Sequence, residues 1–219
     1  MNARNIGRGV AAVAVAYAAV LLGVHLWLVG HDVVRRGAIV AAASTDVFHL
    51  SHDPWRVLPE SAVLARSFIA LWLLAALVCV GSLERHYGSL VTAAVAIAGH
   101  LIGTGVSEGT VAVRVAIGDL PHHSVHLLDV GPSYVVVACG TAAAATPGLR
   151  RWHRWLLVLV LAPFAVQSIE GLPTGEVDAI GHLTAGLVGL GAAAVLKRWA
   201  PKPQLPMRPQ RAAAEPAAR

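Results

Sequence analysis

The sequence predicts an all-α protein built as a bundle of six membrane-spanning helices. Hydrophobic residues make up 56% of the 219 residues, charged residues make up 13%, and the mean hydropathy is +0.65. An ordinary soluble domain is roughly 25% charged, so this composition indicates a polytopic membrane protein. Six apolar runs are also long enough, or nearly so, to cross a hydrocarbon layer that needs about 20 helical residues.

The apolar runs set the predicted spans and the connections between them. In chain order the predicted spans are Val10–Gly30, Val63–Leu83, Leu90–Val106, Val130–Thr146, Trp155–Ile169 and Ala179–Leu196. Segments 31–62 and 107–129 are then long loops, whereas 84–89 and 147–154 are tight hairpins. We expect a cytoplasmic segment 1–9, a membrane domain 10–196 and a disordered, basic, Pro/Ala-rich cytoplasmic tail 197–219.

Lysine and arginine are distributed unevenly between the two sets of helix ends. The ends that include both termini carry twelve of the seventeen, and the other ends carry five. Basic loops stay in the cytoplasm, so both termini are predicted to be cytoplasmic in a cell membrane. The net charge of +5 then reflects topology, and the lipid bilayer, not nucleic acid, is the expected partner. Ala41-Ala42-Ala43 would suit signal-peptide cleavage, but the first run exceeds the usual length of about 7–15 residues, which favours an uncleaved anchor.

The sequence gives little reason to expect a cofactor or metal. Cys79 and Cys139 both lie in apolar runs, which is typical of small buried side chains and not of a disulfide or zinc site. His122 and His126 have i, i+4 spacing and would share one face if their loop were α-helical. They are weak candidate ligands, and we expect neither a metal nor any other cofactor.

A serine and a histidine lie at matching depth in the fourth and sixth spans. Ser133 follows Gly131-Pro132, and His182 follows Gly181. An ionisable residue inside a span is costly unless it has a role, and a serine beside a histidine is the pattern of a nucleophile with its general base. Small residues continue the two helix faces and predict a close seam between them. From Ser133 these are Val137, Gly140 and Ala144; from His182 they are Ala185, Gly189 and Ala192 or Ala193.

Several short motifs, taken together, resemble the rhomboid family of intramembrane serine proteases. They are Asp53-Pro54-Trp55-Arg56-Val57-Leu58 before the second span, Leu83-Glu84-Arg85-His86-Tyr87-Gly88-Ser89 after it, Gly-x-Ser at the fourth span and Gly-His in the sixth. Asp129-Val130-Gly131-Pro132-Ser133-Tyr134 and Gly99-His100 are similar to a divergent bacterial branch, the rhomboid-like proteins. The resemblance covers roughly residues 10–196 and implies a six-span rhomboid-like bundle.

The resemblance implies a catalytic dyad of Ser133 and His182 that cleaves a transmembrane protein substrate. Glu84, Arg85 and Gly88 would form a structural turn, and Gly99 and Gly103 a packing face. Two departures bear on activity. Tyr134 stands where the family has glycine, and Phe68 and Trp72 stand where it has the His and Asn that hold the oxyanion, so substitutes such as the Ser133 amide or His100 would be needed.

Three hypotheses follow from these residues. The first is an intramembrane serine endopeptidase, and the second is an inactive rhomboid relative that binds client membrane helices. The third is a histidine-dependent metal or small-solute membrane protein. Asp129 and Asp178 each precede a dyad residue by four positions. We expect them to favour the positive ends of their helices, and a third catalytic member is the alternative.

Overall fold

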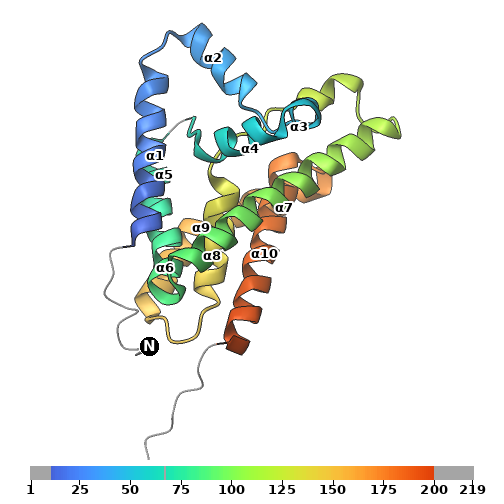
Figure 1. Cartoon of the computed structure of the whole chain (residues 1–219). Helices are drawn as coiled ribbons and strands as arrows, with labels where there is room; N and C mark the ends of the chain where they lie inside the picture. Colours follow the sequence, from blue (N-terminus) through green and yellow to red (C-terminus); the bar gives the residue numbers. More distant parts are fainter. Residues whose placement is uncertain (1–10, 67, 200–219) are drawn as a thin grey trace, which may run out of the picture.

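The computed structural model describes residues 11–66 and 68–199 as an all-helical bundle, with no strand in that part of the chain (Figure 1). The predicted all-α membrane fold is therefore confirmed. Five helical segments are long and apolar enough to span a bilayer, namely Ala12–Val29, Ile69–Tyr87, Ser89–Ala116, Arg151–Thr174 and Val177–Arg198. The predicted segment 1–9 and most of the predicted tail 197–219 lie outside the described residues.

The fourth apolar helix, α8 (Ser133–Ala144), is shorter than the predicted span Val130–Thr146. Its 12 residues are about 18 Å long, which is less than the ~30 Å of a hydrocarbon core. Nine of those residues are buried, because α7 (Ser89–Ala116), α9 (Arg151–Gly171) and α10 (Val177–Trp199) surround the helix. A helix enclosed by protein does not have to match the membrane thickness, since its ends meet protein and not lipid.

The second span is interrupted, whereas the sequence predicts a continuous helix over Val63–Leu83. It consists of α5 (Ile69–Ala75), the π-helical segment η2 (Ala76–Val80) and α6 (Gly81–Tyr87). Phe68 precedes it with φ of 51°, the one positive φ of a non-glycine residue in the described chain. The span therefore begins six residues later than predicted, because the chain turns sharply at Phe68 after leaving α4 (Pro54–Val63).

The two long connections are largely helical. Residues 31–62 form α2 (Val33–Ala42), α3 (Val47–His52) and nearly all of α4, and they lie at one end of the bundle (Figure 1). At that end α3 packs against η3 (His122–His126). Asp32 and Asp46 cap α2 and α3 by accepting from the backbone amides of Arg35 and His49, each at 2.9 Å. The predicted loop 107–129 begins as helix, since α7 continues to Ala116. We call residues 31–63 and 121–130 together the cap.

The hairpin between α6 and α7 is tied to the first helix. Glu84 is buried and accepts hydrogen bonds from the amides of Val13 and Ala14, both at 2.9 Å, and from Ser89 Oγ at 2.6 Å. Gly88 takes φ of 85°, a conformation that favours glycine, and Arg85 is exposed. Glu84 therefore satisfies backbone donors at the start of α1 (Ala12–Val29), which are otherwise without partners.

Candidate catalytic site

Ser133 is the first residue of α8, directly after a turn that the cap holds in place. The turn is fixed at Gly131, whose amide donates to the Ser61 carbonyl at 3.1 Å and whose φ is 147°. Pro132 is buried, and Val136 is the first residue of α8 whose amide bonds back to it. The amides of Ser133, Tyr134 and Val135 therefore have no intrahelical acceptor, which makes this end of α8 electropositive.

His182 lies in α10 and is only 5% exposed. Neither ring nitrogen has a hydrogen-bond partner within residues 11–66 and 68–199. Two aromatic rings meet the imidazole edge to face, Tyr134 with ring centroids 5.5 Å apart and Phe164 of α9 at 5.1 Å. A buried polar ring without partners is unusual in a folded protein, and its presence here points to a role that needs it.

The helix face that begins at Ser133 lines a cavity with His182. Val137 and Thr141, one and two turns after Ser133, border a space of about 280 Å³ together with Phe164, His182 and Gly186. Ser133 and His182 are nevertheless not hydrogen bonded, because both imidazole nitrogens are without partners in the described chain. The structure thus places α8 and α10 side by side, but Ser133 and His182 do not form a hydrogen bond with each other.

The seam between α8 and α10 depends on glycine, and its residues differ in part from the prediction. A Cβ added at Gly189 would overlap Thr141 and the Ala138 carbonyl, and Ala185 is fully buried. Thr141 Oγ1 also donates across the seam to the Gly186 carbonyl at 3.3 Å. Gly140, predicted to lie in this seam, instead packs against Cys79 and Leu161, because it is about 100° around the helix from the seam residue Thr141.

Tyr134 fills the space between three helices at the level of His182. A Cβ at Gly181 of α10 would overlap the phenol ring and hydroxyl, and one at Gly103 of α7 would come within 3.2 Å of the ring. The hydroxyl donates to Asp129 Oδ2 at 3.2 Å. Gly181 and Gly103 together provide the room for this bulky side chain, a relationship that the sequence by itself does not reveal.

Residues 10–201 match the family model of rhomboid-like proteins, which covers most of the chain. The chain belongs to the rhomboid-like protein family. Searches of curated proteins and of solved structures found no significant match. The family establishes the kind of membrane protein, whereas the roles of individual residues in this rhomboid-like protein depend on the geometry around Ser133.

His100 of the rhomboid-like chain is bonded to the cap. Its Nε2 donates to the Leu58 carbonyl of α4 at 2.8 Å and lies 3.3 Å from Ser61 Oγ. Its Nδ1 is buried and without a partner in the described residues. The Nε2 proton that would serve as an oxyanion donor is therefore already engaged in joining α4 to α7.

Phe68 and Trp72 stand at the two positions where the family has its oxyanion His and Asn, and Trp72 borders a second cavity. Trp72 packs against Phe164, with ring centroids 5.9 Å apart, and Phe68 is 77% exposed. Trp72 also borders a space of about 320 Å³ with Val130, Gly131, Pro132 and Arg66. Arg66 is the one charged residue of that lining. No local motif in the sequence marks Arg66 as part of a site.

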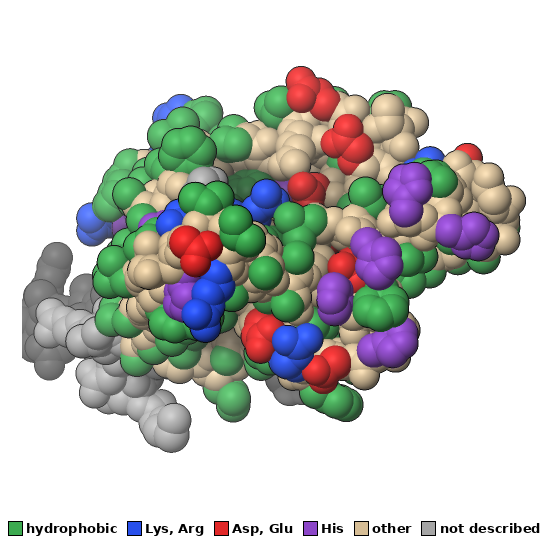
Figure 2. Space-filling model, turned by 90° about the horizontal axis from the view of Figure 1, so that it is seen from above, with side chains coloured by type: hydrophobic (Ala, Val, Ile, Leu, Met, Phe, Trp, Pro, Cys, Tyr) green, Lys and Arg blue, Asp and Glu red, His purple; other side chains and the backbone are tan. Residues whose placement is uncertain are grey.

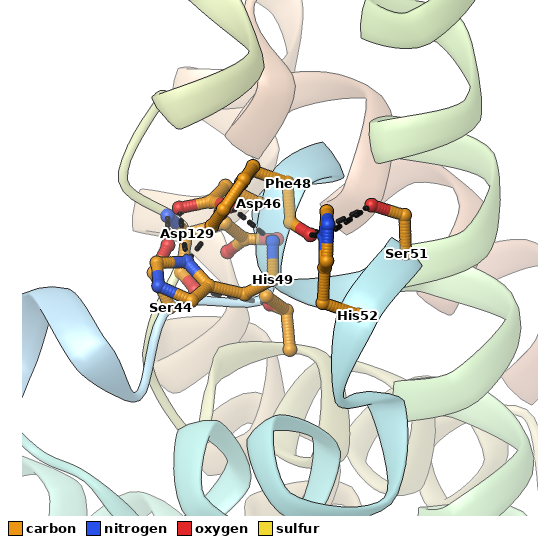
Figure 3. Close-up of polar contacts among 8 residues, drawn as sticks. Ser44, Asp46, Phe48, His49, Ser51, His52 and Asp129 are labelled. Carbon is orange, nitrogen blue, oxygen red and sulfur yellow. Dashed lines mark hydrogen bonds and ion pairs between the residues drawn. The ribbon is translucent and has the colours of Figure 1, made fainter.

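Asp129 lies in the cap segment that precedes α8, and not in the first turn of α8 (Figure 3). Its amide donates to Ser44 Oγ at 3.1 Å, and its carbonyl accepts from the amide and hydroxyl of Thr45 at 2.9 and 3.0 Å. Burial, reinforced by the charge of Asp178, raises the pKa of Asp129 to about 7. Asp178 itself is exposed and accepts from Gln167 at 3.3 Å, so neither acid is hydrogen bonded to His182.

The candidate metal ligands His122 and His126 lie in η3, which is a 3-10 helix. Such a helix has about three residues per turn, so i, i+4 spacing does not place two side chains on one face as it would in an α-helix. His126 instead packs against Phe48, with ring centroids 4.8 Å apart. Several histidine side chains lie near one another on the face seen in Figure 2, but no three His, Cys, Asp or Glu residues of the described chain are grouped to hold a metal ion.

Proposed function

We propose that this rhomboid-like protein is an intramembrane serine endopeptidase whose nucleophile is Ser133 and whose general base is His182. The observation that carries the proposal is the buried, unpartnered imidazole of His182, beside the α8 face that starts at Ser133. No structural requirement of the described residues explains a polar ring at that position. A base that must accept a proton from Ser133 Oγ and then release it would explain it.

The chemistry follows from the groups on the two helices. Ser133 Oγ would attack the scissile carbonyl of a transmembrane protein substrate as its proton passes to an imidazole nitrogen. The open amides at the start of α8 would face the developing oxyanion in place of the absent His and Asn. His182 would then protonate the leaving amine, and water would hydrolyse the acyl ester on Ser133. In this proposal both termini are cytoplasmic, and the site opens towards the outer face of a cell membrane.

A fluorophosphonate probe on protein in intact membranes tests the proposal. We expect covalent labelling of the wild-type chain and none for Ser133→Ala or His182→Ala. Ser168→Ala is the matched control, because Ser168 borders the same cavity and bonds to the Phe164 carbonyl of its own helix. Equal labelling of wild type and Ser133→Ala, in chains that are both folded, would refute Ser133 as the nucleophile.

A second candidate function is the binding of client membrane helices without hydrolysis. It is favoured by the position of Tyr134, whose ring meets His182 and packs against Gly181 while the dyad stays open. Under this reading, wild type and Ser133→Ala would both resist the probe. Tyr134→Gly would then gain Ser133-dependent labelling, because removal of the ring frees the space between the helices.

A further inference from the structure

Between the cap and α7 lies a group of buried carboxyl groups that the proposed chemistry does not use. Glu108 of α7, Asp46 before α3 and Asp129 before α8 are 3%, 2% and 5% exposed. They come from three parts of the chain and lie within electrostatic range of one another. Figure 3 shows that Asp46 and Asp129 lie beside Ser44 and His49 within the cap. Three acids are therefore gathered where water is largely excluded.

Glu108 is the least compensated of the three, with only the backbone amide of Val47 close to its carboxylate. Both of its carboxylate oxygens lack a hydrogen-bond partner in the described chain, and so does Thr104 Oγ1, one turn earlier on the same helix face. Asp46, by contrast, accepts from His49 Nδ1 at 2.8 Å, and Asp129 accepts from Tyr134. An isolated carboxylate buried in this way costs several kcal/mol, so such a group requires a cation or a proton.

The surrounding side chains do not supply a cation to Glu108. The described ion pairs of arginine lie elsewhere, joining Arg56 to Asp53 and Glu60, and Arg114 to Asp119. A metal is also disfavoured, since the residues described include no group of three ligands placed for one. A proton is the remaining compensation. The titratable groups on the elements packed around Glu108 include Asp46, His49 and His52, His122, His123 and His126, Asp129 and Tyr134, and Asp178 and His182.

We propose that Glu108, with Asp129 and Asp46, forms a buried proton-binding site that latches the cap over the Ser133 and His182 helices. With the proton bound, the group tolerates close approach of the cap to α7. Without it, at least two carboxylates repel each other, and segments 44–46 and 129–131 move away from α7. Asp129 is joined to Tyr134 through the hydroxyl, so this movement draws the Tyr134 ring away from His182.

The direction of control follows from the charges. Raising the pH removes the proton, loosens the cap and opens the space beside His182, whereas lowering the pH closes it. The pKa of Asp129, raised to about 7 by its burial, agrees with a transition in this range. The control of catalysis rests on the proposed function of Ser133. The proton site does not depend on that function, so an experiment can refute either proposal without refuting the other.

Infrared spectroscopy of the full chain in lipid tests the proton directly. At pH 7 we expect a carbonyl-stretch band of protonated carboxyl groups in wild type, and the part of that band that belongs to Glu108 should be lost in Glu108→Gln and in Glu108→Leu. Leucine serves as the second variant because a buried amide could itself misfold the region. Glu170→Gln is the matched control, since Glu170 is exposed. A difference spectrum of wild type minus Glu108→Leu that lacks this band would overturn the proton site.

Access to the catalytic helices is read with Ser133→Cys and a membrane-impermeant maleimide. The labelling rate of Ser133→Cys should rise between pH 6 and pH 8. This rise should be about tenfold larger in the chain that keeps Glu108 than in the chain that also carries Glu108→Leu, in which the cap stays closed. Comparing the two chains at the same pH cancels the effect of thiol ionisation on the labelling rate. The wild-type chain, whose Cys79 and Cys139 are buried, gives the background labelling. Equal pH profiles in the two backgrounds would overturn the latch.

Discussion

The phenol ring of Tyr134 packs against Gly181 so closely that no side chain fits in place of the glycine hydrogen. This contact fixes the spacing of α8 and α10 directly beside His182. Gly181-His182 is thus a structural pair as well as a chemical one. The glycine admits the tyrosine, and the tyrosine in turn covers the histidine.

Gly181→Ala should separate the two helices. The added Cβ overlaps the Tyr134 ring, and overpacking of this kind costs about 1–3 kcal/mol. We expect a lower thermal unfolding temperature in detergent micelles. Gly191→Ala, where a Cβ meets open space, should leave that temperature unchanged or slightly raised. Equal unfolding temperatures for the two variants would contradict the packing described here.

Glu84→Ala should destabilise the start of the bundle. It leaves the amides of Val13 and Ala14 and the hydroxyl of Ser89 without their acceptor, at a cost of roughly 1–3 kcal/mol for each group that stays buried. Thermal unfolding and proteolysis near α1 measure the effect. Arg85→Ala is the neighbouring control, since Arg85 is exposed and its loss should change stability by about 0.5 kcal/mol or less.

Asp129 should make the stability of the protein depend on pH. Its pKa is about 7 in the folded chain against 3.8 for an exposed aspartate, so the folded state binds the proton more tightly. The resulting stabilisation is complete below about pH 4 and is lost as the pH rises through 7, at up to about 1 kcal/mol per pH unit. Thermal unfolding between pH 4 and pH 8 should show this slope, and Asp129→Asn should flatten it. A slope of the opposite sign would be incompatible with a buried acid.

His100→Ala separates a structural role from an oxyanion role. The structural contact is the 2.8 Å bond from Nε2 to the Leu58 carbonyl, which joins α4 to α7. We expect a loss of about 1–2 kcal/mol in stability, with the fluorophosphonate labelling rate of the folded fraction unchanged. A fall in that rate of about 10²-fold without loss of folding would instead identify His100 as an oxyanion donor.

Local pattern was sufficient for much of the fold. Apolar runs located the first, fifth and sixth spans to within a few residues, because lipid requires a continuous apolar helix whatever its neighbours are. The requirement of about 20 apolar residues was misleading for α8, since a helix enclosed by protein does not have to match the thickness of the membrane. It also missed the turn at Phe68 and the extension of α7 to Ala116, because hydropathy by itself does not mark where a helix begins or ends.

For the site, the sequence by itself determined which residues are available: a serine at the start of one apolar helix, a histidine in another, and Tyr134 in place of a small residue. Only the tertiary structure decided that Gly181 and Gly103 accommodate that tyrosine, that His182 lacks a hydrogen-bond partner among the described residues, and that Glu108 lies beneath the cap with Asp46 and Asp129. The physical reason is that spacing along one helix fixes which face a residue occupies, whereas contacts between helices depend on how segments far apart in the chain are packed.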